Sequence, residues 1–335
     1  MYEDLVNRLR QSDNTSIRWK LHVDVLGEDP GSKAMQRLQD EIRDGPIVRT
    51  LLAHRDADGR IRTRRDVYDK WHGAHWVFAA LADVGYPRGD EALLPLRDQV
   101  YEFWLRDEFY REFTAASRQQ AYRGVGVPVM QGRHRRCASQ QGNALLSAAR
   151  LGLLDAAADR LVERLRHWQW PDGGWNCDKN PAADTSSFME TLLPMRGLGV
   201  FAQERKDEST RRAALEAAEV FLSRRLFKRR SDGATISAVF VDLHHPVYWH
   251  YDVLAGLGAM AELGCIGDPR CSDALDVLER KQRNGGGWTA DARFYSRSAT
   301  PKHGTDSVDW NAARGAMNEW ITVRALAVLR AAGRV

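Results

Sequence analysis

The feature that most restricts how this chain can fold is a seven-residue signature that occurs twice. The segments Gln169–Trp175 and Gln282–Trp288 each place a glycine four residues after a glutamine and a tryptophan six residues after it. Each copy follows a segment of helical periodicity and precedes a loop and another such segment. Arg55–Ile61 is a weaker third copy in which only the glycine survives. Self-similarity of this kind predicts a repeating helical hairpin of uneven length.

The signature has a local physical meaning. A glycine allows the special backbone angles of a tight turn, and a glutamine amide can bond backbone groups that are exposed at helix ends. The tryptophan ring is then expected to cover the turn of the next repeat. These are structural roles, so the signature predicts architecture and leaves activity open.

Helical periodicity dominates the rest of the chain, and strand alternation is scarce. Clusters of glycine, proline and aspartate, such as Gly85-Tyr86-Pro87, separate the periodic segments and would break or cap helices. No change of composition marks a linker. The sequence therefore predicts an all-α fold, with apolar residues three and four apart in segments 100–113, 144–151, 156–168, 211–226, 252–263, 272–281 and 320–331.

Composition and charge exclude several classes of protein. The chain has 335 residues and 43% hydrophobic residues, enough for a substantial core. Its 49 Lys and Arg nearly balance 45 Asp and Glu, so charge gives no reason to expect binding to nucleic acid or to an anionic membrane. No apolar stretch approaches the ~18 to 20 residues of a membrane-spanning helix. We therefore expect a soluble cytoplasmic protein whose four cysteines are reduced thiols.

The two intact signatures resemble the QW motif of squalene and oxidosqualene cyclases. Asp172-Gly173-Gly174-Trp175, followed by the segment 184–188, is similar to a turn and helix start in the β subunits of protein prenyltransferases. The resemblance implies a single α/α toroid, in which inner helices surround a cavity and outer helices wrap them. It covers residues 35–335, and residues 1–34 are expected to form a helical segment that packs on this barrel.

The resemblance implies a function less directly than a fold. Triterpene cyclases protonate their substrate with an Asp-x-Asp-Asp motif, which is absent here, and Asp56-Ala57-Asp58 stops after two acids. The zinc and magnesium motifs of the related families are absent too. The leading hypothesis is an enzyme for acid-initiated cyclisation or isomerisation of an isoprenoid or another apolar small molecule, and it requires no cofactor.

Candidate proton donors follow from the toroid, because the first turns of inner helices would point at the cavity mouth. Asp252 is the preferred acid, since it is flanked by aromatic residues and by His250, which would position or return the proton. Asp184 is the second candidate, although it could instead cap a helix. Glu190, six residues further on, completes the set of candidate catalytic residues. Burial among aromatic rings would raise the pKa of such an acid.

Aromatic and imidazole side chains at the same helix starts are the candidate substrate-binding groups. Aromatic faces there could stabilise a carbocation, with packing as the alternative role. The predicted substrate-binding residues are Trp71, His72, His75, Trp76, Tyr248, Trp249, Trp310 and Trp320.

Two alternative functions remain open. A metal-dependent enzyme acting on a more polar substrate would use His72, His75, His250 and Cys177 as candidate ligands of zinc or iron. His72 and His75 are three residues apart, which would make them neighbours on one helix face. The other alternative is a toroid that binds a ligand or partner without catalysis.

Overall fold

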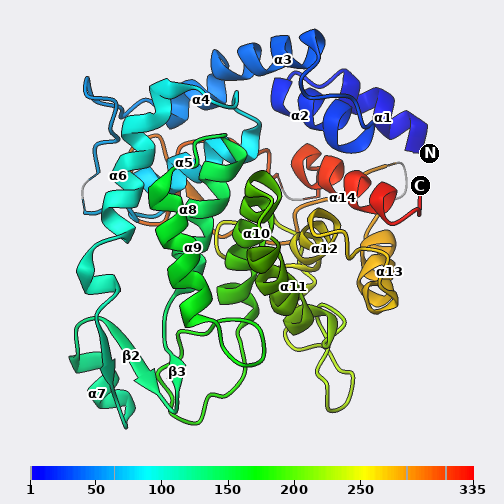
Figure 1. Cartoon of the computed structure of the whole chain (residues 1–335). Helices are drawn as coiled ribbons and strands as arrows, with labels where there is room; N and C mark the ends of the chain where they lie inside the picture. Colours follow the sequence, from blue (N-terminus) through cyan, green and yellow to red (C-terminus); the bar gives the residue numbers. More distant parts are fainter. Residues whose placement is uncertain (1, 64, 284–285, 314) are drawn as a thin grey trace.

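A computed structural model describes residues 2–63, 65–283, 286–313 and 315–335, and these residues are mostly helical (Figure 1). The all-α prediction is therefore confirmed in its coarse form. A π-helical turn, η1 (Leu21–Val25), continues α2. The α-helices are α1 (Tyr2–Arg10), α2 (Thr15–Lys20), α3 (Lys33–Arg43), α4 (Pro46–Leu51), α5 (Ala74–Val84), α6 (Leu94–Trp104), α7 (Arg118–Arg123), α8 (Ala138–Arg150), α9 (Ala156–Trp168), α10 (Phe188–Arg205), α11 (Glu208–Leu222), α12 (Val253–Glu262), α13 (Ser272–Arg280) and α14 (Glu319–Ala331).

Short strands are present as well, which the sequence pattern did not indicate. β1 (Glu112–Thr114) pairs in parallel with β2 (Val127–Met130), and β2 pairs antiparallel with β3 (Arg133–His134). β4 (Ser296–Arg297) and β5 (Thr305–Asp306) form a second, two-stranded sheet. The helix expected over 100–113 is wrong beyond Trp104, where α6 ends and the chain turns into β1.

The longer helices alternate between two positions along the chain. α5, α8, α10, α12 and α14 contact one another in that order, and α6, α9, α11 and α13 contact α5, α8, α10 and α12, respectively. α10 has 18 residues, the most of any helix in the described ranges, and it contains Pro194. None of the helices described is both long and apolar enough to cross a lipid bilayer.

The tryptophan of each signature ties two helices together. The indole N–H of Trp175 donates to the carbonyl of Leu165 in α9 at 2.8 Å, ten residues earlier. Its backbone N–H donates to the hydroxyl of Thr191 in α10 at 3.1 Å. Trp288 repeats both contacts, with the carbonyl of Leu278 in α13 at 2.7 Å and the hydroxyl of Thr322 in α14 at 3.0 Å. Each signature tryptophan thus fixes the end of one helix, α9 or α13, against the helix that follows it, α10 or α14.

The glutamine and the glycine join each turn to the next outer helix. The Gln169 amide donates to the carbonyls of Gly173, at 2.6 Å, and of Ala213 in α11, at 2.9 Å. Gly173 has φ +97°, and a Cβ there would lie 2.2 Å from the carbonyl oxygen of Glu216 in α11. Asn284 and Gly285 of the second copy lie outside the described residues.

The degenerate third copy forms the same turn. Asp56 N–H bonds to the carbonyl of Arg60 at 2.7 Å, as Trp170 N–H bonds to that of Gly174 at 2.8 Å. Arg55 takes the place of the glutamine, and its Nε donates to the carbonyl of Gly59 at 3.2 Å. A guanidinium and an amide are both long donors, so the turn keeps its geometry although the residue type has changed.

The N-terminal helices pack against the C-terminal ones. α2 and η1 contact α14, and α1 and α2 lie beside α14 in Figure 1. At Gly286, in the second signature, a Cβ would lie 2.8 Å from the side chain of Leu5 in α1. In the first signature the corresponding glycine contacts the next outer helix, so α1 occupies that position here. The predicted boundary between residues 34 and 35 falls inside α3.

Replacing the turn glycine should weaken the whole fold. We expect Gly173→Ala to lower the free energy of unfolding by about 2 to 4 kcal/mol, because a left-handed backbone is strained and the Cβ displaces α11. Gly233→Ala is the matched control, since φ is +70° and no atom lies within 4 Å of the added Cβ, and it should cost about 1 kcal/mol. Urea unfolding measures both. Equal losses would show that the contact with α11 contributes nothing.

Candidate functional site

A cavity of about 890 Å³ lies between helices from both ends and the middle of the chain. Its walls come from α2 and η1, α5, α8, α10, α12 and α14, and α3 adds Gln36 and Gln39. Most of these helices contribute residues from their C-terminal halves, such as Asp83 at the end of α5 and Glu262 at the end of α12. The sequence predicts the cavity mouth at the starts of these helices, whereas the wall residues lie mostly toward their ends.

Three charged side chains form one cluster in this cavity. Glu262 accepts from Arg196 through both carboxylate oxygens, each at 2.7 Å, and also from Arg150. Burial opposes the charged form of Glu262, but the two guanidinium groups outweigh it and lower the pKa to about 2. Glu262 is therefore an anion at neutral pH, and its charge holds two arginines at the cavity wall.

Asp83 stands opposite this cluster and faces further basic groups. Its carboxylate lies 4.0 Å from Arg150 and 3.9 Å from Nδ1 of His245. Burial opposes ionisation, but Lys20, His245 and Arg324 lower the pKa of Asp83 well below its usual range. Arg324 keeps a buried Nη1 with no hydrogen-bond partner among the described residues. The cavity thus holds a guanidinium donor that the protein itself does not satisfy.

A second, smaller pocket of about 80 Å³ lies deeper and shares four charged residues with the cavity, namely Asp83, Arg150, Arg196 and Arg324. The rest of its wall is apolar and aromatic apart from Asn143 and Ser147, and it includes the predicted residues Trp76, Tyr248 and Trp310. The enclosed space therefore has an aromatic inner end and a charged outer part.

Asp306 lies behind the aromatic wall. The Tyr248 hydroxyl donates to its carboxylate, and the Trp310 indole N–H donates to the same oxygen at 2.7 Å. The N–H of Val308 donates to the other oxygen at 2.8 Å. Asp306 is 6% exposed, and burial raises its pKa despite these three donors. Of the acids around the inner pocket, this one is biased toward its protonated form.

Asp252, the acid preferred from the sequence, caps α12. Its carboxylate accepts from the N–H of Ala255 at 2.7 Å and from that of His244 at 2.9 Å. Burial disfavours its charge, but His244 outweighs burial and the pKa is lowered. A carboxylate held as an anion by these contacts is a poor proton donor.

Asp184 does not cap a helix. It is exposed in the loop before α10, and that helix begins at Phe188 with Ser187 as its cap residue. The expected capping role at Asp184 is therefore wrong, because the chain continues for three more residues before the helix starts.

Glu190, in the first turn of α10, lies beside Cys177 in the loop that precedes this helix. Glu190 accepts from the N–H of Ser139 in α8 at 3.1 Å and from the thiol of Cys177 at 3.3 Å. Cys137 completes a group whose ligand atoms lie within 4.8 Å of one another. The Cys177 pKa is raised, first by its hydrogen bond with Cys137 and then by burial, which favours the neutral thiol.

The predicted histidine ligands have separate partners. Nε2 of His72 lies 3.2 Å from Asp69, whereas Nδ1 of His75 accepts from the indole of Trp104 at 3.0 Å. His250 stacks on Trp249, with ring centroids 4.0 Å apart, and burial lowers the pKa of His250 and of His75 to about 3. Among the described residues, none of the groups of three possible metal ligands contains His72, His75 or His250.

The other predicted aromatic residues are mostly packed in the core. Trp71 stacks on Tyr248 with ring centroids 3.7 Å apart, and its indole donates to the carbonyl of Phe294. Trp320 is 1% exposed and stacks on His245 at 4.8 Å. Trp249 lies under Lys70, 4.9 Å from its ammonium. These rings support the pocket wall, and they are not among the residues that line the pocket.

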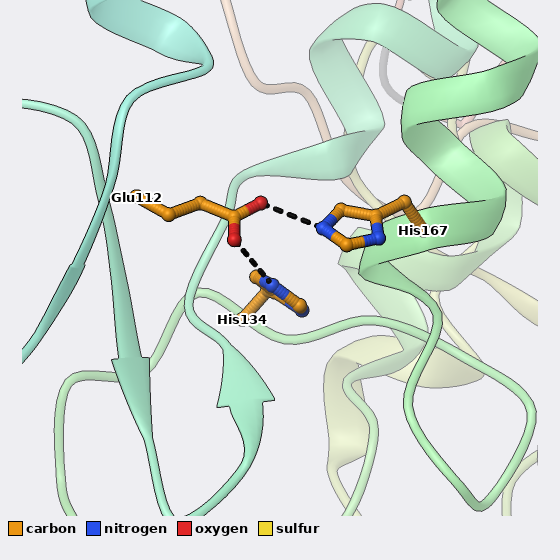
Figure 2. Close-up of side chains that lie close together, drawn as sticks. All are labelled: Glu112, His134 and His167. Carbon is orange, nitrogen blue, oxygen red and sulfur yellow. Dashed lines mark hydrogen bonds and ion pairs between the residues drawn. The ribbon is translucent and has the colours of Figure 1, made fainter.

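A further group of possible metal ligands lies outside the cavity. Glu112, His134 and His167 converge from three elements, with the glutamate between the two imidazoles (Figure 2). The sequence singled out none of the three as a ligand. Because they are 22 and 33 residues apart, no local spacing marks them as a set.

The cavity charges were also missed, although the sequence carries a signal for them. Asp83 is the single Asp, Glu, Lys or Arg of α5, and Glu262 is that of α12, two strongly apolar helices. A lone charge on a helix that is otherwise buried needs a partner or a polar cavity. Read in this way, such residues predict a cavity wall.

Comparison with known proteins does not place the chain in a family. No family model matches it, and no curated protein matches it either.

The Glu262 cluster should contribute to stability because one carboxylate neutralises two guanidinium groups whose side chains are 13% and 27% exposed. We expect Glu262→Gln to lower the free energy of unfolding at pH 7 by about 2 kcal/mol, since two guanidinium groups lose their counter-charge. A carboxylate with a lowered pKa stabilises the fold above its unfolded value of about 4.3. The difference between the two proteins should therefore shrink as pH falls from 4.3 toward 2.

The matched control is Glu102→Gln, which breaks a two-bonded pair with Arg60 at 2.8 Å on the surface. Exposed pairs contribute about 0 to 1 kcal/mol. Chemical denaturation across this pH range measures both variants. A loss at Glu262 no larger than the loss at Glu102 would mean that the cavity screens its charges as well as bulk water does.

Proposed function

We propose that this protein is an α/α toroid enzyme that binds an apolar, isoprenoid-like molecule in its central cavity and begins a cyclisation or isomerisation by protonating it. Three observations support the toroid. The inner helices contact one another in sequence order, α14 reaches the α2 and η1 segment, and Trp19 of α2 packs against Gly85 at the end of α5. Together these contacts support a ring of six inner helices around the cavity.

The division of the cavity supports a substrate with one apolar end and one anionic end. Trp76, Tyr248 and Trp310 line the inner pocket, which is small and suits the end of a hydrocarbon chain. Arg150, Arg196 and Arg324 stand where that pocket meets the wider cavity. Guanidinium groups bind planar or multidentate anions, and the unpartnered Nη1 of Arg324 is available to one.

The single observation that carries the reaction type is the contact between Asp306 and Tyr248 at the pocket wall. When Asp306 is protonated, its carboxyl can donate to the oxygen of Tyr248, which frees the phenolic proton for the pocket. That proton would add to one carbon of an alkene as the π bond breaks, leaving a cation on the other carbon. Loss of a proton from the product cation back to Tyr248 and Asp306 would restore the enzyme.

The aromatic wall would stabilise the cation. Faces of Trp and Tyr attract a positive charge by about 0.5 to 2 kcal/mol each when water is excluded. Trp71 stacks on Tyr248 and holds that ring in place. In this proposal Asp306 replaces Asp252 as the acid, because Asp252 is held as an anion by the start of α12.

Binding can be tested before any product is known. We expect farnesyl diphosphate to bind more tightly than farnesol, and Arg324→Met to weaken binding of the diphosphate by about tenfold or more while farnesol is little affected. Arg60→Met is the control, since it removes a surface guanidinium. Calorimetric titration measures both ligands. If neither ligand binds at millimolar concentration, the cavity is not a site for such amphiphiles.

Turnover is tested with linear isoprenoid diphosphates, alcohols and squalene, with products separated by gas chromatography and mass spectrometry. We expect Asp306→Asn and Tyr248→Phe to reduce conversion by about a hundredfold or more, and the wild-type rate to fall as pH rises through the raised pKa of Asp306.

The matched control for turnover is Asp309→Asn, three residues after Asp306 but exposed and paired with Arg297. Full activity in Asp306→Asn would refute the relay. Tight binding without conversion of any substrate would instead favour a toroid that binds a ligand without catalysis.

A further inference from the structure

Glu112, His134 and His167 come from three different elements and meet at one point on the surface. Glu112 lies in β1, His134 in β3, and His167 in the last turn of α9. Figure 2 shows the carboxylate of Glu112 between the two imidazole rings. This group lies outside the cavity and has no part in the function proposed above.

The geometry of the three side chains is convergent. Nε2 of His167 lies 2.7 Å from one oxygen of Glu112, and Nε2 of His134 lies 3.3 Å from the other. The two ring centroids are 4.6 Å apart. Glu112 and His167 are partly open to solvent, with side chains 32% and 47% exposed, whereas the His134 side chain is 15% exposed. An ion could therefore reach the point between them from bulk water.

We propose that Glu112, His134 and His167 form a binding site for one divalent transition-metal ion of the zinc type. Two imidazole nitrogens and one carboxylate oxygen are a donor set that zinc accepts, with a water molecule as the fourth ligand. The three ligand atoms already lie within 4.8 Å of one another. Since metal–ligand bonds to zinc are about 2.0 to 2.2 Å, only small side-chain movements bring all three atoms into range.

Proton balance is compatible with binding near neutral pH. In the metal-free protein each Nε2 can donate its proton to Glu112, and a metal replaces those two protons at the same atoms. Each neutral imidazole then carries its proton on Nδ1, so no net proton release is required from a neutral ring. Burial lowers the pKa of His134, which keeps that ring neutral at pH 7.

The position of the site gives the ion a structural consequence. β1 and β3 belong to the segment between α6 and α8, whereas His167 lies in the last turn of α9, just before the first signature. The indole of Trp170, within that signature, already donates to the carbonyl of His134 at 2.8 Å. A bound ion would add a second tie between the small sheet and the repeat, and would stabilise the folded protein by mass action.

The test is a calorimetric titration of chelator-treated full-length protein with zinc at pH 7.5, together with the unfolding temperature at each zinc concentration. We expect one zinc per chain and a rise in unfolding temperature. His167→Ala and Glu112→Gln should weaken zinc binding by more than about tenfold, since each removes a direct ligand.

His22→Ala is the matched control, because His22 makes a surface contact with Glu28 at the same 2.7 Å distance and should not affect zinc binding. The double variant Cys137→Ser/Cys177→Ser removes the competing thiol group and should retain the site. Absence of saturable binding would overturn the proposal. It would equally be overturned if binding survived in His167→Ala and Glu112→Gln or disappeared with the thiols.

Discussion

The rest of the structure depends on the hydrogen bond from the signature tryptophan to the carbonyl ten residues before it. The last carbonyls of a helix lack partners within the helix, and an indole N–H buried in a core needs an acceptor. Trp175 and Trp288 satisfy both requirements with one bond, to Leu165 and to Leu278. The backbone N–H of each tryptophan also donates to a threonine hydroxyl in the following helix. These two bonds fix α9 to α10 and α13 to α14.

Because the hairpins are fixed in this way, the positions of the inner helices determine which of their side chains line the cavity. Their charged residues Asp83, Arg150, Arg196, Glu262 and Arg324 line the cavity. Each buried charge requires an opposite charge or a polar cavity, since desolvation would otherwise cost several kcal/mol. The cluster around Glu262 meets that requirement, and the unpartnered nitrogen of Arg324 gives the cavity unused capacity for an anion.

Much of the fold was predictable because its rules are local. Helical periodicity over 156–168 corresponds to α9 residue for residue, and the glycine turn was identifiable even in its degenerate copy at Gly59. The small sheets were not predictable, since strands of two to four residues carry too little alternation. Glu112, His134 and His167 were missed for a different reason. These three residues are close only because the segment before α8 folds against the end of α9. No spacing in the sequence indicates that contact.

The candidate acids show why the sequence predicts the reactive groups at the starts of the inner helices, whereas the cavity charges lie toward their ends. A helix start leaves backbone N–H groups unsatisfied, and acids or amides placed there are drawn into capping them. Asp252 caps α12 and Asn318 caps α14, so both side chains are engaged by the backbone. A residue later in an inner helix has no such obligation, because the backbone around it is already bonded. Asp83 and Glu262 are placed in this way, and Asp306 escapes capping because it lies on a short strand behind the pocket wall.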